Sequence, residues 1–463
     1  AAGFDPFVSW GCGEHVHEPL IQSTLITTDA NLEFVNDLAT EYYCADDGMT
    51  WYFTIRDDAK FTDGEPLSAS DVAFTINGII ESAEADLSMV EKAVATDDTH
   101  VEITMTKPYN ALLYTLAVVG IVPEHAHGED YGANPIGSGR YMLEQWDRGQ
   151  QVILKANPDY YGEAPKMERV VVVFMEEDAA LAAVRAGQVD IAYTSATYSD
   201  QTSEGYELFA CETVDSRGIS LPSIAAGQTK ADGANKYPAG NDVTCDLTVR
   251  RAINYGVDRQ AMIDNVLNGY GTPAYSVCDS SPWGSPDMKV ETDVEAARKL
   301  LDEAGWALGE DGIRSKDGVR AAFDMYYASD DSVRQALAAE FADQMKELGI
   351  EVSIKGASWD DIYPHEFATP ILWGWGSNAP TELYELTYSK GWGNYACYDN
   401  AEIDSYLDEA LAVPYIEDSY ELFQKAQWDG TQGVAPQGAA TWVWLANVDH
   451  LYFKRTGLEV AEQ

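Results

Sequence analysis

Basic residues are scarce in this chain. It has 29 Lys and Arg against 77 Asp and Glu, which gives a formal net charge of -48. Nucleic acids and anionic membrane surfaces are bound through clustered Lys and Arg, so we exclude nucleic acid as a partner. The acidity permits a cationic ligand without requiring one, and a solvated surface on a secreted or salt-adapted protein is the favoured explanation over an electrostatic funnel for cations.

Long apolar runs are also missing. No segment has the length and apolarity of a transmembrane helix, and no signal peptide is present. The chain starts at Ala1 rather than Met. We therefore expect a processed or trimmed product.

Cysteines are few and widely spaced. There are six, and none forms a C-x-x-C pair, which disfavours a tetrahedral zinc ribbon. One or two disulfides suit an oxidising compartment, and Cys245 with Cys278 is the first expected pair because the two flank one helix.

Two common catalytic signatures are absent. The Gly-rich loops lack the Gly-Lys-Ser/Thr ending of a phosphate loop, and no Gly-x-Ser-x-Gly elbow occurs. We therefore expect a protein that is not an enzyme and that carries no cofactor.

The elements that are present predict an α/β protein. An alternating strand at Trp51–Ile55 precedes a helix capped by Ser68 or Ser70. Later segments predict strands, helices, a linker and a β-α-β step. They are strands at 141–146, 151–156, 170–175 (apolar enough to be covered on both faces), 217–221 and 442–451, helices at 178–186 and 292–301 (with a Thr292–Glu295 capping box), a helix at 247–268 interrupted at 256–258, a loop at 222–242, and the β-α-β step at 323–327, 333–348 and 350–354.

Five blocks in one order carry a resemblance to a known family. They are 50–76, 134–190, 249–255, 300–306 and 403–410. Together they resemble the extracytoplasmic solute-binding proteins of ABC importers, peptide/nickel-binding class (solute-binding protein family 5), from about Glu14 to the end of the chain.

The resemblance implies a two-lobed α/β fold of the periplasmic-binding-protein type, with a hinge between the lobes. Lobe I is expected at 1–218 with a small extra subdomain at about 30–135, and lobe II at 219–440, while 441–463 returns to lobe I. Members often extend beyond both ends of this chain, so we expect both ends to be incomplete.

The resemblance also implies a function. The chain would be a monomeric receptor that captures an oligopeptide or a metal chelate such as a nickel chelate between its lobes, and delivers this small-molecule ligand to an ABC permease for transmembrane transport. Its location would be extracytoplasmic, either at the cell surface as a membrane-anchored lipoprotein or in the periplasmic space. Peptide and chelate ligands both remain open.

Ligand pockets in such receptors are rich in aromatic residues. The densest aromatic stretch is 372–398, where a Gly-spaced Trp pair predicts a loop. Asn378 lies in the segment where peptide-binding members carry an Asp for the peptide ammonium group, and Arg140 and Arg217 are candidates for holding an anion. Core packing and surface ion pairing are the alternatives for these residues. The expected ligand-binding residues are Trp10, Arg140, Arg217, Trp373, Trp375, Asn378, Trp392 and Tyr395.

Two similar histidine pairs are the only candidates for a metal site. Residues two apart lie on nearly opposite sides of a helix, so neither pair alone chelates a metal well there, although both together could do so. The pairs are His15 with His17 and His125 with His127.

Two other classes of protein remain as alternatives. A secreted glycan hydrolase would also use aromatic residues and paired acids. A surface interaction protein built on the same receptor fold would bind a macromolecule instead of a solute.

Overall fold

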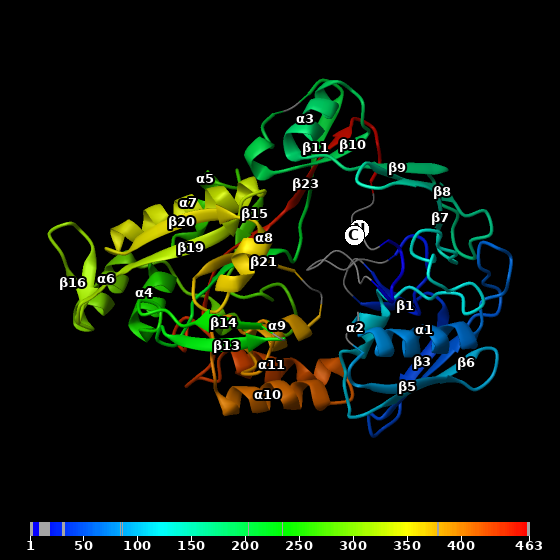
Figure 1. Cartoon of the computed structure of the whole chain (residues 1–463), viewed down its shortest axis with the longest axis horizontal. Helices are drawn as coiled ribbons and strands as arrows, with labels where there is room; N and C mark the ends of the chain where they lie inside the picture. The colour runs from blue at the N-terminus through cyan, green and yellow to red at the C-terminus, as the bar shows by residue number, and fades with distance from the viewer. Residues whose placement is uncertain are drawn as a thin grey trace. The chain divides into compact units, whose positions relative to one another are not determined.

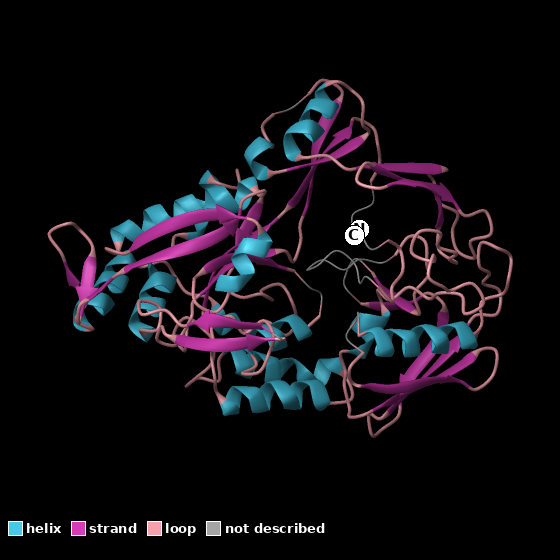
Figure 2. Ribbon diagram, in the orientation of Figure 1, coloured by secondary structure: helices cyan, strands magenta, loops and turns pink. Residues whose placement is uncertain are grey.

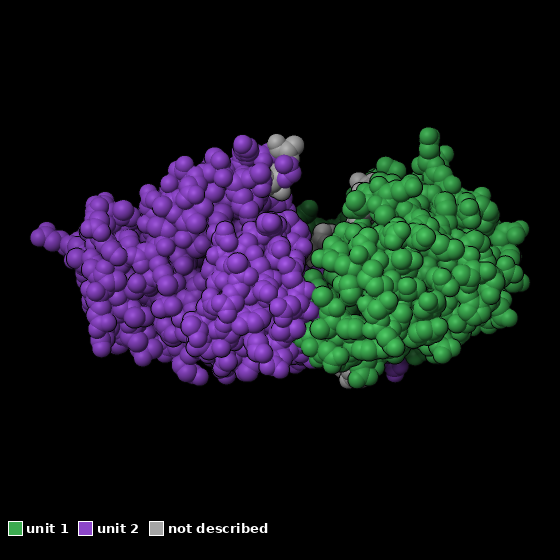
Figure 3. Space-filling view, turned by 90° about the horizontal axis from the view of Figure 1, so that it is seen from below, with its two compact units in different colours: residues 1–176, 411–419, 461–463 green, residues 177–410, 420–460 purple. Residues whose placement is uncertain are grey.

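The chain has 463 residues. The structure is a computed structural model that describes residues 3–8, 19–29, 33–83, 85, 87–201, 203–233, 235–376 and 379–460. The chain forms two compact units, coloured separately in Figure 3. Unit 1 comprises 1–176, 411–419 and 461–463, and unit 2 comprises 177–410 and 420–460. The lobes predicted from the sequence divide the chain elsewhere, near 218 and 440, and those boundaries stay a prediction.

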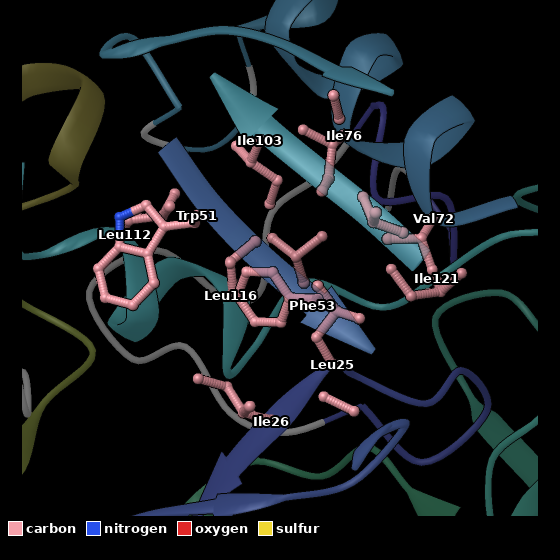
Figure 4. Close-up of a cluster of buried hydrophobic side chains, with 14 of the residues drawn as sticks. Leu25, Ile26, Trp51, Phe53, Val72, Ile76, Ile103, Leu112, Leu116 and Ile121 are labelled. Atoms are coloured by element: carbon pink, nitrogen blue, oxygen red, sulfur yellow. The ribbon is translucent and has the colours of Figure 1, made fainter. Parts of the chain in front are cut away.

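Unit 1 is built around a four-stranded antiparallel sheet in the order β3-β4-β6-β5. Alternate residues of β4 are buried, and Phe53 packs in the same core as Val72 and Ile76 of α1 (Figure 4). Asp71 accepts a hydrogen bond from the backbone N–H of Ser68 at 2.9 Å, so Ser68 is the N-cap, one of the two predicted. The elements of unit 1 are β1 (Ile26–Thr28), β2 (Phe34–Asn36), β3 (Ala39–Cys44), β4 (Thr50–Ile55), α1 (Ala69–Ser82), β5 (Val90–Ala95), β6 (His100–Met105), α2 (Leu112–Leu116), β7 (Tyr141–Asp147), β8 (Gln151–Ala156) and β9 (Arg169–Val173).

The strands predicted near 141, 151 and 170 form a second antiparallel sheet in the order β7-β8-β9. The prediction that the last of them is covered on both faces is wrong. β9 is an edge strand, and Val171, Val172 and Val173 are each 43% exposed. Apolar composition alone does not distinguish a central strand from an edge strand.

Unit 2 is organised by a six-stranded mixed sheet in the order β15-β22-β12-β21-β19-β20. Strand β19 is parallel to both β20 and β21, and the other pairings in this sheet are antiparallel. The elements of unit 2 are α3 (Glu177–Arg185), β10 (Ile191–Thr194), β11 (Tyr206–Cys211), β12 (Ser216–Ser220), β13 (Gln228–Asp232), β14 (Asn235–Ala239), α4 (Leu247–Gly256), α5 (Arg259–Asn265), β15 (Gly271–Pro273), α6 (Val294–Glu303), β16 (Ala307–Leu308), β17 (Arg314–Lys316), β18 (Val319–Arg320), β19 (Ala322–Ala328), α7 (Ser332–Glu347), β20 (Glu351–Ala357), α8 (Trp359–Ile362), β21 (Ile371–Trp375), α9 (Thr381–Thr387), α10 (Ala401–Ala412, whose end belongs to unit 1), α11 (Tyr420–Gln427), β22 (Trp442–Val448) and β23 (His450–Arg455).

One face of this sheet is covered by helices. Ile219, Leu372 and Val443 share a buried apolar core with residues of α4, α5, α6 and α7. Figure 1 shows α7 running along β19 and β20, which completes the predicted β-α-β step. The predicted interruption of the 247–268 helix is also confirmed, because Asp258 caps a separate helix, α5.

Three local predictions in unit 2 are wrong. The N-cap of α6 is Asp293, which accepts from Ala296 N–H at 2.8 Å, whereas the Thr292 hydroxyl donates to the Val257 carbonyl. The segment predicted as a loop at 222–242 contains the β13–β14 hairpin, drawn as two adjacent strands in Figure 2. The apolar run at 442–451 forms two strands, β22 and β23, which belong to different sheets.

The predicted Cys245–Cys278 disulfide is not formed, and both residues are free cysteines. The Cys245 thiol donates to the Asp242 carbonyl, whereas Cys278 is buried and contacts Gln427. Burial is the main cause that raises the pKa of the Cys278 thiol. Flanking one helix in the sequence therefore did not bring the two sulfurs together.

Among the described residues nearly all acidic side chains lie at the surface. The only buried acids of these residues are Asp5, Asp71, Asp215 and Glu366. With a formal net charge of -48, mutual repulsion destabilises the folded state and salt should relieve it. We expect the unfolding temperature to rise by about 5–10 °C between 0.05 M and 1 M NaCl. Thermal unfolding followed by circular dichroism measures this shift, with choline chloride at equal ionic strength as a control for Na⁺ binding. A midpoint that does not change with salt would contradict the prediction.

Candidate ligand-binding site

The predicted aromatic stretch begins on a strand, not on a loop. Residues 371–375 form β21, a fully buried central strand paired with β12 on one side and β19 on the other. From the sequence, Gly374 predicts a loop. In the structure it lies inside a central strand, where neighbouring side chains approach the backbone so closely that a larger residue would be crowded. Because side chains alternate along a strand, Trp373 and Trp375 share one face and Gly374 lies on the other.

The face with Trp373 and Trp375 carries a set of contacting rings. Trp373 stacks on Tyr395 with ring centroids 4.2 Å apart and ring planes at 8°. Trp359 stacks on the Trp373 ring with centroids 5.6 Å apart. Trp375 contacts Trp392 at 5.6 Å and Tyr395 at 6.2 Å. Tyr395 also contacts Trp442 of β22 at 6.3 Å. We call Trp359, Trp373, Trp375, Trp392, Tyr395 and Trp442 the aromatic cluster.

The rings of the aromatic cluster differ sharply in exposure. Trp373 is 1% exposed, and its indole N–H donates to the Ser220 hydroxyl at 3.0 Å. Trp375 is also buried, and its indole nitrogen has no hydrogen-bond partner among the described residues. Trp392 is 58% exposed. The cluster therefore combines a packed interior with one ring that a solute can reach.

A small cavity borders the aromatic cluster at Trp442, and the neighbouring Trp444 also lines it. Its volume is about 20 Å³, and Met288, Leu383 and Val434 line other parts of it. That volume holds a single water molecule and no larger solute. Contact with a solute at the aromatic cluster is therefore expected at the exposed ring of Trp392.

The opposite face of β21 brings together two arginines. Arg217 of β12 is paired with Gly374 in the register, and Arg334 comes from the first turn of α7. A Cβ atom placed on Gly374 would lie 2.7 Å from Nη1 of Arg217 and 2.3 Å from Nη2 of Arg334. We call these two residues the arginine pair.

Each member of the arginine pair has an acidic partner. Arg217 donates from both Nη1 and Nη2 to Asp215, which also contacts His450 Nε2 at 3.1 Å. Burial lowers the pKa of Arg217, but the charge and hydrogen bonds of Asp215 together with the charge of Asp331 outweigh burial, and the net shift is upward. Arg334 donates to Asp331 at 2.8 Å and lies over the Trp359 ring at 5.4 Å. The arginine pair is thus charged and adjoins the aromatic cluster.

Five of the predicted site residues meet in this region of unit 2: Arg217, Trp373, Trp375, Trp392 and Tyr395. Arg140 belongs to unit 1, where it is exposed and its Nε donates to the Tyr160 hydroxyl at 3.4 Å. Its role as an anion-holding residue stays a prediction. Trp10 and Asn378 lie outside the described residues.

The predicted histidine metal site gains no support. His125 Nε2 contacts Asp63 at 2.7 Å, and this hydrogen bond raises the pKa of His125. His127 Nε2 contacts a different carboxylate, that of Asp5, at 3.1 Å. No group of three or more His, Cys, Asp or Glu that could hold a metal occurs among the described residues, and His15 and His17 lie outside them.

Five contributors to this region were not predicted as site residues from the sequence: Asp215, Asp331, Arg334, Trp359 and Trp442. One signal could have found two of them. In α/β sheets, ligand sites collect at the carboxyl ends of parallel strands. Asp331 and Arg334 follow β19, and β21 is parallel to β19, so both sets of side chains gather at one edge of the sheet.

Comparison with known proteins identifies the family. The model for bacterial extracellular solute-binding proteins, family 5, matches residues 33–395. The chain belongs to this family. It is 34% identical over 455 residues to Protein XP55 of Streptomyces lividans, covering 92% of this chain and 79% of that protein. It is 26% identical to the oligopeptide-binding protein AppA of Bacillus subtilis, covering 89% of this chain and 80% of AppA.

Solved structures share the fold. NikZ from Campylobacter jejuni, solved in complex with Ni(L-His), superposes with a TM-score of 0.83 at 23% identity, covering 100% of this chain and 94% of NikZ. This likeness confirms the predicted α/β fold of the two-lobed binding proteins.

Family membership also fixes the general role. The chain is an extracytoplasmic solute-binding component of an ABC importer, and its relatives are binding proteins of transporters. The glycan hydrolase alternative gains no support from these comparisons. In the part of the chain that the structure describes, no helix has the length and apolarity needed to cross a membrane.

Proposed function

We propose that this chain is a non-enzymatic, monomeric receptor that captures an oligopeptide on the aromatic cluster of unit 2 and delivers it to an ABC permease. It acts in the periplasm or at the cell surface as an anchored lipoprotein. This choice of ligand follows the oligopeptide-binding protein AppA, to which the chain is 26% identical. A metal chelate is the other ligand class of the family, and the test below separates the two.

One observation carries the proposal: Trp392 exposes 58% of its surface while its ring contacts the buried Trp375 at 5.6 Å. Apolar groups of a ligand that cover the exposed Trp392 ring would bury a large aromatic surface, which favours binding. Packing against Trp375 holds the Trp392 ring in place. Flat rings accept side chains of many shapes, which suits a receptor for peptides of varied sequence.

Native mass spectrometry of the protein as purified tests the ligand class, with the bound mass identified after denaturation. A ladder of peptide masses is the expected result. One metal-containing adduct would overturn the peptide assignment in favour of a chelate. Protein that stays free of added mass, even after incubation with a peptide digest and with nickel–histidine, would contradict both ligand classes.

The Trp392→Ala variant tests the site. We expect peptide affinity to fall about tenfold or more, because the ligand loses its exposed aromatic contact. Tyr415→Ala is a suitable control, since Tyr415 is a ring of similar exposure, 54%, that belongs to unit 1. Equal affinity of the two variants, measured by calorimetry, would place the peptide away from Trp392.

A further inference from the structure

A larger cavity lies in unit 1 and has no residue in common with the aromatic cluster. Its volume is about 750 Å³, within the range of cavities that hold small organic ligands. Figure 4 shows Val72 and Ile76 of α1 pointing into the core of unit 1. The cavity is lined by a different stripe of α1, in which Phe74, Gly78 and Glu81 recur at helical spacing. We call it the α1 cavity.

Three rings form the apolar part of the α1 cavity. The ring centroid of Phe7 lies 4.3 Å from that of His127 and 5.7 Å from that of Phe74. Phe74 also contacts His127 edge-on, with centroids 5.6 Å apart. All three side chains line the cavity and are only partly buried. The rings therefore keep surface that a ligand can cover, and cations are attracted to the faces of such rings.

Gly78 allows the Phe7 ring to lie against the backbone of α1. A glycine inside a helix weakens the helix compared with an alanine, so its presence within α1 needs a reason. A Cβ atom placed on Gly78 would lie 2.2 Å from Cε2 of Phe7, so any larger residue would displace the ring. The backbone N–H of Phe7 donates to Asp5 at 2.9 Å, which anchors the segment. The helix thus loses some stability in order to hold an aromatic ring at the cavity.

The charges around the α1 cavity favour a cation. Glu81 and Glu124 line it and are exposed, and no Lys or Arg is found among its described lining residues. The backbone N–H of Glu124 donates to Asp71 at 2.9 Å, which fixes this residue beside α1. His127 can become positive, but its Nε2 contacts Asp5 at 3.1 Å, and this carboxylate would balance the charge. The cavity therefore attracts positive charge and repels anions.

We propose that the α1 cavity is a second binding site, separate from peptide capture, and that it takes an organic ammonium cation such as a quaternary ammonium ion. The ammonium group lies over the faces of Phe7 and Phe74, where the ring quadrupole attracts positive charge. Glu81 and Glu124 add long-range attraction, and the apolar body of the cation fills the remaining volume. A metal ion does not fit, because no group of three His, Cys, Asp or Glu suited to a metal occurs among the described residues.

Isothermal calorimetry with choline tests the site. The matched probe is 3,3-dimethylbutan-1-ol, which has the shape of choline but no charge. For the unaltered protein we expect choline to bind at least about tenfold more tightly than the alcohol, because only the cation gains from the ring faces and the carboxylates. Equal affinity for the two probes overturns the assignment of a cation. Failure of choline to bind overturns the site itself.

The double variant Glu81→Gln/Glu124→Gln tests the charges. Both side chains are exposed, so the fold should be kept. Choline affinity should fall about fivefold, while affinity for the alcohol should not change. Glu41→Gln/Glu91→Gln is the matched control, because it removes the same charge from exposed residues of unit 1 that do not line the cavity. An equal loss in both double variants would show that net charge, and not this site, attracts the cation.

The Gly78→Ala variant tests the rings. Alanine suits a helix better than glycine, and the atom it would meet is the far end of a side chain, so the variant should fold while displacing Phe7. Choline affinity should fall about tenfold, and peptide capture should stay unchanged. Gly128→Ala is the control, since a Cβ there meets nothing within 4 Å. Full choline affinity in folded Gly78→Ala would overturn the site. If that variant does not fold, Phe74→Leu replaces it, because leucine stays apolar but has no ring face.

Discussion

Replacing Trp373 by alanine should lower the free energy of unfolding by about 3–5 kcal/mol, the usual cost of truncating a fully buried tryptophan. Trp373 is 1% exposed, stacks on Tyr395 with centroids 4.2 Å apart, and donates to Ser220. The variant leaves a cavity between stacked rings and a buried hydroxyl without its donor. Trp392 belongs to the same cluster but is 58% exposed, so Trp392→Ala should change stability by less than about 0.5 kcal/mol.

Urea denaturation followed by circular dichroism measures both variants against the unaltered protein. Because the chain has two compact units, the transition of unit 2 is followed separately by limited proteolysis if the curve has two steps. Similar costs for the two tryptophans would contradict the division of the aromatic cluster into a packed interior and an exposed ring. It would also remove the reason for expecting ligand contact at Trp392.

The elements set by local signals could be predicted from the sequence. The β19-α7-β20 step was found because its apolar spacing changes from strand to helix and back. The break between α4 and α5 was found because Asp258 is a strong N-cap beside a glycine. These signals lie within a few residues of the structure that they specify.

The missed features depend on neighbours that are distant in the sequence. β21 was predicted as a loop because Gly374 separates two tryptophans, and only the arginines from β12 and α7 explain a glycine inside a central strand. Likewise, nothing near Arg217 in the sequence indicates Arg334, which is brought there by sheet order. The family resemblance predicted the aromatic stretch, but the arginine pair could be recognised only once the sheet was in place.

Replacing Asp215 by alanine should cost about 3–5 kcal/mol, since it leaves a charged guanidinium buried without its counter-ion. Arg217 is 8% exposed, and apart from Asp215 its guanidinium donates to the Ser216 carbonyl at 3.3 Å. Arg56 and Asp58 form a matched ion pair, also two residues apart, but the Asp58 side chain is 62% exposed. Asp58→Ala should therefore cost less than about 1 kcal/mol.

The double variant Asp215→Ala/Arg217→Met distinguishes two reasons for keeping a buried ion pair. A buried pair replaced by apolar side chains often loses no stability, so the double variant should recover most of what Asp215→Ala loses in urea denaturation. If the pair exists for stability, the double variant stays as unstable as the single one. If stability returns, the protein does not need this buried charge in order to fold, and the Asp215–Arg217 pair is kept for a reason other than stability.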